Sequence, residues 1–259
     1  MPHGRRLPAI LPEVSGLAYL PDGRLAAVND GGHPPDVYAI DLRDGGLDTL
    51  TRGRDGNRDW EAIAVGADGS RLVVCDVGDN RRARPHVDLY AYDLPDPQRR
   101  TRTRLTYPGG ARDCEACLVR GDTVTLISKA PALNGARDRT AYVYRARLGP
   151  EATLVLVDSF TLRRRSVTDA AYLRGDTLAL LTYDFRLIGP IPLSKTTVYV
   201  GTLADFRQNR VRRRSVRAPF TWTQYEALAY PGRGDHVVIA SERTVIWPQR
   251  WRRVRLPDR

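Results

Sequence analysis

Lysine is nearly absent from this chain of 259 residues, and methionine, cysteine and histidine are scarce. Only Lys129 and Lys195 are lysines, so arginine carries almost all of the formal net charge of +11. An arginine-rich, lysine-poor composition more often reflects genome composition than nucleic-acid binding, so we expect no nucleic-acid partner. The positive field still favours small anionic ligands.

The three cysteines give no even disulfide set, so no disulfide framework is expected. The spacing of Cys114 and Cys117 resembles a redox or zinc CxxC motif, but both residues lie in a predicted strand. Strand side chains alternate between faces, so residues three apart are expected on opposite sides. We therefore predict neither metal nor redox chemistry at this pair.

No apolar run is long enough to cross a membrane. The early segment Leu7–Pro12 is too short, and too rich in proline, for the core of a signal peptide. The expected location is the cytoplasm, or outside the cell if a leader is removed. The sequence also lacks the Gly-x-Ser-x-Gly elbow, the P-loop, the His-Glu-x-x-His motif and the dinucleotide fingerprint, which argues against those chemistries.

One pattern occurs five times along the chain. Each copy has an acid or serine, small and apolar residues, a turn, and a second strand that ends in a polar residue. The copies begin 46, 54, 54 and 57 positions apart, at Ser15, Glu61, Glu115, Asp169 and Glu226. Alternation of period two between turn signals divides each copy into strands. Strand-only repeats of roughly 40–50 residues are typical of β-propeller blades.

The predicted fold is therefore all-β, a single five-bladed β-propeller over residues 1–259. Its blades are expected at approximately 13–58, 59–112, 113–166, 167–223 and 224–259. The last repeat lacks a fourth strand, whereas a spare segment, Arg5–Leu11, precedes the first repeat. We expect this N-terminal strand to close the ring on the last blade, which removes an exposed sheet edge.

In a propeller the first strand of each blade lines the central channel, so the five leading side chains should converge at one mouth. Asp59 lies two residues before Glu61, and the second strands end nearby at Asp30, Asp76, Lys129, Tyr183 and Glu242. Crowded carboxylates in a poorly solvated channel must be protonated, paired with cations or bound to a metal. Oxygen ligands from separate blades favour Ca²⁺. The predicted Ca²⁺ ligands are Ser15, Glu61, Glu115, Asp169 and Glu226; the alternative is that these acids simply end strands in water.

Three segments carry a resemblance to known families: Asp59-Trp-Glu-Ala-Ile-Ala, Asp76-Val-Gly-Asp-Asn80, and Glu226-Ala-Leu-Ala with Ser241-Glu242. They resemble the actinobacterial β-propeller proteins of the phytase-like, or esterase-like, type. The five-blade acidic ring also resembles the soluble calcium-activated nucleotidases (apyrases), in which inner-strand Glu and Ser residues hold a central Ca²⁺. That resemblance implies the same five ligands in this chain. It does not imply nucleotidase activity, because the apyrase residues that act on the nucleotide are not recognisable.

Two loops near the same mouth, 29–33 and 78–82, combine glycine with polar or basic residues. They could contact an anionic group, and they are equally expected as plain Asx-type turns. The residues assigned to substrate binding are Lys129, Arg81, Arg82, Asp59 and Asn80. Those assigned to catalysis, as acid, base or anion clamp, are Asp30, Asp76, Glu242, Tyr183 and His33. Lys129 could alternatively neutralise the acids without a metal.

The leading functional hypothesis is a Ca²⁺-assisted enzyme that acts on a small anionic or polyoxygenated substrate, most like a phosphoester hydrolase. The first alternative is a metal-free cyclase or isomerase of specialised metabolism, with the carboxylates and Tyr183 as acid and base. The second is a non-catalytic binding module with a structural cation. We expect no organic cofactor, no membrane partner and a monomeric chain.

Overall fold

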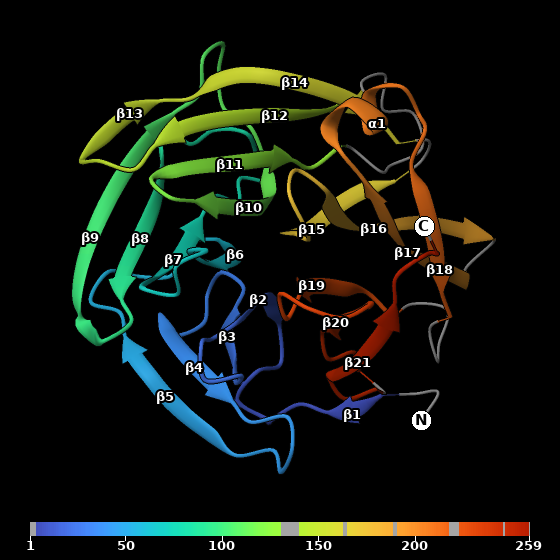
Figure 1. Cartoon of the computed structure of the whole chain (residues 1–259), viewed down its shortest axis with the longest axis horizontal. Coiled ribbons are helices and arrows are strands. Elements are labelled where there is room, and N and C mark those ends of the chain that lie inside the picture. Colours follow the sequence, from blue (N-terminus) through green and yellow to red (C-terminus); the bar gives the residue numbers. More distant parts are fainter. Residues whose placement is uncertain are drawn as a thin grey trace.

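A computed structural model of the protein describes residues 4–130, 140–162, 165–188, 191–217, 223–245 and 247–258. Within these ranges the strands form five small sheets arranged around one axis, as the view down that axis shows (Figure 1). The prediction of an all-β, five-bladed propeller is confirmed. No helix in the described ranges is long and apolar enough to span a bilayer.

Each blade has four antiparallel strands that follow one another from the axis outward. The inner strands are β2 (Val14–Tyr19), β6 (Trp60–Val65), β10 (Cys114–Arg120), β15 (Ser166–Tyr172) and β19 (Tyr225–Ala229). The second strands are β3 (Leu25–Asn29), β7 (Arg71–Asp76), β11 (Thr123–Ser128), β16 (Leu178–Ile188) and β20 (His236–Ser241). The third strands are β4 (Asp36–Ile40), β8 (Val87–Asp93), β12 (Thr140–Arg147), β17 (Ile191–Gly201) and β21 (Arg250–Arg255). The outer strands are β5 (Leu47–Arg52), β9 (Asp96–Thr106), β14 (Val155–Thr161), β18 (Arg212–Val216) and β1 (Arg5–Arg6).

The N-terminal strand closes the ring as predicted. β1 pairs antiparallel with β21, with Arg5 opposite Trp251, and the two strands lie side by side in Figure 1. The strand is shorter than the predicted Arg5–Leu11, because Pro8 has no backbone N–H and cannot continue the pairing. Beyond it, Leu7 and Leu11 are buried in the core between the last blade and the first.

The outer part of the third blade is divided into two short strands. The chain there forms β13 (Glu151–Thr153), which pairs in parallel with β9 of the second blade, and then β14 in its own blade. Leu154 lies between the two strands, buried, and its N–H donates to the Thr106 carbonyl at 2.9 Å. β13 therefore covers the outer edge of the neighbouring sheet.

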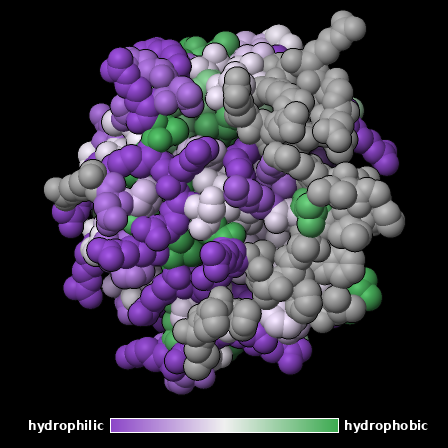
Figure 2. Space-filling model, turned by 90° about the vertical axis from the view of Figure 1, so that its right-hand side faces the viewer, coloured by the Kyte–Doolittle hydropathy of each residue, from purple (hydrophilic) through white to green (hydrophobic). Residues whose placement is uncertain are grey.

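The hydrophobic core consists of five clusters, one at each junction between neighbouring blades. Alternating side chains of each strand face the two neighbouring blades, so the inner and second strands are mostly buried on both faces. The outer surface is different: hydrophilic side chains cover much of the described rim in Figure 2. The helix α1 (Leu203–Arg207) lies on this rim and is capped by Thr202 and Asp205 in a capping box.

A disulfide joins Cys75 of β7 to Cys117 of β10 and so links the second and third blades, which corrects the expectation from cysteine number. Cys114 remains free and buried, and the Tyr107 hydroxyl donates to its Sγ at 3.0 Å. The predicted alternation also fails, because a register shift between Cys114 and Ala116 changes the parity of the strand. Cys114 and Cys117 consequently lie in the same core cluster.

Candidate functional site

Every inner strand has a break in register, a β-bulge, near its first residue. The breaks lie between Val14 and Gly16, Trp60 and Ala62, Cys114 and Ala116, Val167 and Asp169, and Tyr225 and Ala227. A bulge leaves one residue unpaired and turns its side chain. The unpaired residues are Ser15, Glu61, Glu115, Thr168 and Glu226. The repeat register is therefore as predicted in four blades.

In the fourth blade the equivalent residue is Thr168 and not Asp169, which corrects the predicted register by one position. The Thr168 hydroxyl donates to the carbonyl of Tyr225 at 3.2 Å. Ser15 makes the same link in the first blade, with its hydroxyl 2.6 Å from the carbonyl of Trp60. Both hydroxyls thus connect one inner strand to another.

Asp169 lies one residue deeper in the channel and is also engaged by the backbone. Its carboxylate oxygens accept the N–H of Ala170 at 2.7 Å and the N–H of Leu228, in the next blade, at 2.6 Å. Burial raises its pKa well above the ordinary value. Of the five predicted ligands, Ser15 and Asp169 therefore already serve as links between blades.

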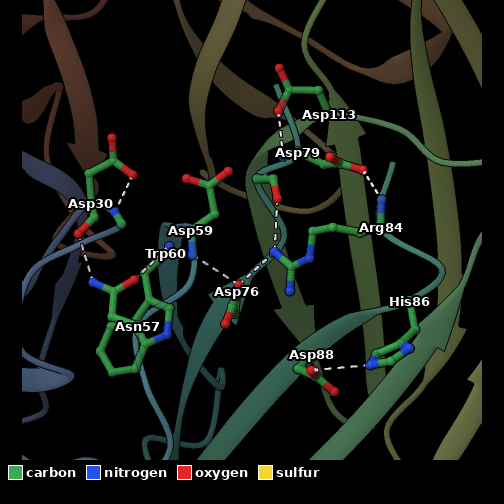
Figure 3. Close-up of polar contacts among 12 residues, drawn as sticks. Asp30, Asn57, Asp59, Trp60, Asp76, Asp79, Arg84, His86, Asp88 and Asp113 are labelled. Atoms are coloured by element: carbon green, nitrogen blue, oxygen red, sulfur yellow. Dashed lines mark hydrogen bonds and ion pairs between the residues drawn. The ribbon is translucent and has the colours of Figure 1, made fainter. Parts of the chain in front are cut away.

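Five acids form two groups that share Glu61, and the predicted ligand Glu226 belongs to neither. Ligand oxygens of Asp30, Asp59 and Glu61 lie within 4.8 Å of one another, and those of Glu61, Asp113 and Glu115 do the same. Glu61 is only 4% exposed, and within the described residues its carboxylate has neither a hydrogen bond nor an ion pair. Figure 3 shows the Asp59 carboxylate between Asp30 and Asp113. We call this set of five residues the acidic mouth.

Asn57, which sequence reasoning missed, fixes the first side of the acidic mouth. Its amide donates to the carbonyls of Asn29 at 3.0 Å and Asp30 at 2.7 Å, and its Oδ1 accepts the N–H of Trp60 at 3.0 Å (Figure 3). The side chain of Asp30 is held in turn by the N–H of Gly31. Its position just before an inner strand is the sequence feature that could have marked Asn57 as part of the site.

Arg84, also missed, holds the second side. Its Nη1 donates to Asp76 Oδ1 at 2.7 Å and to the Gly78 carbonyl at 2.8 Å, and both side chains of this ion pair are buried (Figure 3). Asp76 Oδ1 also accepts the N–H of Asp59 at 3.2 Å. Asp76 was predicted as a base, but these contacts make it a structural partner of Arg84. A buried acid at a strand end requires a counter-charge. That requirement could have predicted a basic partner for Asp76 from the sequence.

The loop 78–84 wraps around Asp79. The carboxylate of Asp79 accepts the N–H groups of Ala83 and Arg84, and its own N–H donates to Asp113 Oδ1 at 2.9 Å. The Asp79 carboxylate thus holds its own loop, but through N–H groups four and five residues on rather than the two of the Asx turn weighed as the alternative. The predicted anion-contacting residues at its tip, Asn80, Arg81 and Arg82, are exposed.

Gly78 lies directly against the acidic mouth. A Cβ at this position would be 2.5 Å from Asp59 Oδ2 and from Glu61 Oε1. Only glycine therefore lets the backbone approach both carboxylates while leaving them room.

On the far side of the channel Lys129 forms an ion pair with Glu115. Burial, Glu226 and Asp113 raise the pKa of Glu115 to about 8, against the effect of Lys129. Burial lowers the pKa of Lys129, but Glu115 and the other acids raise it by more, so the amine stays charged. Burial also raises the pKa of the predicted acid Tyr183 to about 12.

Burial and neighbouring acids also raise the pKa values of Glu242, which is not one of the five acidic-mouth residues, and of Asp59, which is. Burial, with Asp30 and Glu13 nearby, raises the pKa of Glu242 to about 7. Burial and Asp30 raise that of Asp59 to about 6. The predicted catalytic residue His33 lies farther out, on the rim, with Nε2 2.9 Å from Glu13 Oε2.

Glu226 predicts how stability depends on pH. Burial and the charge of Glu242 raise its pKa from 4.5 to about 8. Because the folded state holds this proton more tightly, stability falls as pH rises from about 4.5 to about 8, and then levels off. In EDTA, urea denaturation should give a free energy of unfolding about 1–3 kcal/mol lower at pH 8.5 than at pH 6. Glu226→Gln should reduce this difference; an unchanged difference would contradict the assignment.

Comparison with known proteins does not assign this chain to a family. No protein-family model matches the chain, and no curated protein matches its sequence. Among solved structures, a chain of Kuenenia stuttgartiensis hydrazine synthase is similar over 87% of this chain, with 13% identity and a TM-score of 0.45; this chain spans 61% of its length. A chain of a mitotic checkpoint complex is similar over 99% of this chain and 83% of its own length, with 12% identity and a TM-score of 0.43. Neither likeness carries an argument about function.

Proposed function

We propose that the acidic mouth binds one divalent cation, Ca²⁺, and that the protein hydrolyses small phosphoesters there. The observation that carries the proposal is Glu61, a buried carboxylate without a protein partner in the described residues, shared by two groups of acids. Leaving such a charge buried and uncompensated is costly, whereas a cation at this position would neutralise it.

The residues present fit Ca²⁺ by chemistry and by spacing. All donors in the two groups are carboxylate oxygens, which Ca²⁺ and Mg²⁺ prefer. Two oxygens bound to one Ca²⁺ at 2.3–2.6 Å can lie up to roughly 5 Å apart, and the oxygens in each group lie within 4.8 Å. One cation could be held by Glu61 together with either Asp30 and Asp59 or Asp113 and Glu115, in place of the five ligands predicted from the repeat.

The cation also accounts for how an anionic substrate could approach so many acids. Bound there, Ca²⁺ would orient the phosphoester and polarise the oxygen under attack. Glu242, with a pKa of about 7, is suited to exchange a proton near neutral pH. Lys129 supplies a fixed positive charge beside Glu115, and Tyr183 a hydroxyl donor. Asp76 and His33 have no role in this scheme, because they are held by Arg84 and Glu13.

Removing the metal is the direct test. The purified chain should contain about one Ca²⁺, and saturating Ca²⁺ should raise its melting temperature over that in EDTA by about 5–10 °C. Hydrolysis of p-nitrophenyl phosphate or bis(p-nitrophenyl) phosphate should stop in EDTA and return with Ca²⁺. Binding of Ca²⁺ without turnover of either ester would leave a structural cation site and overturn the hydrolase.

A second candidate rests on the Lys129–Glu115 ion pair. This pair supplies a counter-charge inside the protein, so the remaining acids could be protonated and act without metal. The mouth would then resemble an acid–base site for cyclisation or isomerisation, with Glu242 and Tyr183 as proton carriers. No bound metal in the purified chain, and a melting temperature that EDTA does not change, would favour this candidate over the first.

A further inference from the structure

The opposite half of the central channel contains a cavity of about 490 Å³, and most of the side chains that line it are apolar. All five inner strands line it. These strands surround the centre of the ring in Figure 1. Each inner strand begins at the acidic mouth and rises roughly 3.3 Å per residue. The cavity, lined by the later residues of these strands, therefore opens at the other mouth, and no residue of the acidic mouth lines it.

The lining falls into three layers when each inner strand is counted from its bulged residue. The deepest layer, two residues on, is Leu17, Ile63, Cys117, Ala170 and Leu228. The middle layer is Ala18, Ala64, Leu118, Ala171 and Ala229. The outermost layer is Tyr19, Val65, Val119, Tyr172 and Tyr230. Four alanines in one layer explain why the channel is open at this depth, since short side chains leave the axis unfilled.

The lining offers almost no free charge. Its one charged side chain, within the described residues, is Arg120. The Arg120 guanidinium pairs with Asp176 at 2.7 Å and lies over the ring of Tyr172, 4.1 Å from its centre. Arg120 therefore already has a partner, in an ion pair that is itself exposed, and the three layers of the lining contain no charged side chain.

We propose that this cavity is a binding site for a neutral, mainly aromatic small molecule. Its volume lies within the roughly 300–1,000 Å³ of ligand pockets. Its walls are formed mainly by aliphatic side chains, so a ligand with apolar surface gains from leaving water there. The rings of Tyr19 and Tyr230 in the outermost layer, and the side of the Tyr172 ring that Arg120 does not cover, provide contacts for an aromatic ligand. The site is independent of the cation proposed at the other mouth.

The probe for this test is N-phenyl-1-naphthylamine, a neutral aromatic dye that fluoresces in apolar surroundings. Titration of the full chain should show saturable binding of one dye per chain. Ala64→Trp fills the middle layer and should weaken binding at least tenfold. Val65→Trp narrows the partly exposed outermost layer and should also weaken binding at least tenfold. It serves as the second variant if Ala64→Trp does not fold. Circular dichroism and thermal melting establish which variants fold.

Two controls locate the dye. Ala204→Trp, on the exposed surface of α1, should leave its affinity unchanged, and so should EDTA. Absence of saturable binding to the folded chain would overturn the proposal. So would less than a twofold effect in every folded cavity variant, because the dye would then occupy another surface such as the exposed Val155–Val157. Loss of binding in EDTA would also overturn it, by linking the dye to the acidic mouth.

Discussion

Glu61→Gln is expected to abolish Ca²⁺ binding and to reduce phosphoester hydrolysis by more than the roughly 10–100-fold typical of residues outside the ligand shell. The substitution keeps the shape of the side chain and removes one charge. Because Glu61 belongs to both groups of acids, this single change affects both. Isothermal titration with Ca²⁺ and steady-state hydrolysis of bis(p-nitrophenyl) phosphate measure the two effects.

Stability separates this prediction from simple damage to the fold. Without metal, Glu61→Gln should be at least as stable as the parent chain, because burial raises the pKa of Glu61 and makes its charged form costly. With Ca²⁺ the order should reverse, since only the parent chain gains the binding energy. Glu151→Gln is the matched control: its carboxylate is exposed on β13, far along the blade, and both binding and activity should be unchanged. Normal Ca²⁺ binding by Glu61→Gln would contradict the assigned site.

Arg84→Met is expected to have the largest effect on folding, a loss of about 3–5 kcal/mol in the free energy of unfolding. Asp76 and Arg84 are 2% and 5% exposed, so removal of the guanidinium leaves a buried carboxylate without its counter-charge. The loss also releases the Gly78 carbonyl, which Arg84 holds beside the acidic mouth. Urea denaturation of the purified variants measures the change.

A second substitution tests whether charge is the cause. Asp76→Asn in the Arg84→Met background should restore part of the lost stability, because the uncompensated charge is then removed. Arg43→Met provides the comparison, since Arg43 and Asp41 form an exposed ion pair, and no measurable change is expected there. If the double variant is no more stable than Arg84→Met, lost packing and not charge explains the effect.

The five repeats determined the architecture before any coordinates. Turn signals and period-two alternation are local properties, so the number of blades and the order of strands could be predicted from them. The spare N-terminal segment predicted the closure, because a ring with an unpaired edge is unfavourable. The strand is shorter than predicted because Pro8 cannot continue the pairing. Pro8 is visible in the sequence, but the prediction from the repeat pattern did not take it into account.

The site was only partly predictable, for one physical reason: a bulge changes strand parity without a sequence signature of its own. The alignment of acids therefore placed Asp169 where the structure has Thr168. The same effect at Glu115 brings Cys114 and Cys117 to one side of the strand, against the predicted alternation. The disulfide from Cys117 to Cys75 was missed for another reason, because an odd number of cysteines does not exclude a single pair.

The sequence by itself determined which residue types reach the mouth of the channel, because each blade repeats the same local pattern. Tertiary structure decided which of them meet. Glu61 became the shared, unpaired carboxylate, while Asp76 found Arg84 and Glu115 found Lys129. Pairing of this kind depends on distances between loops of different length, and those distances are fixed only when the five blades pack around their common axis.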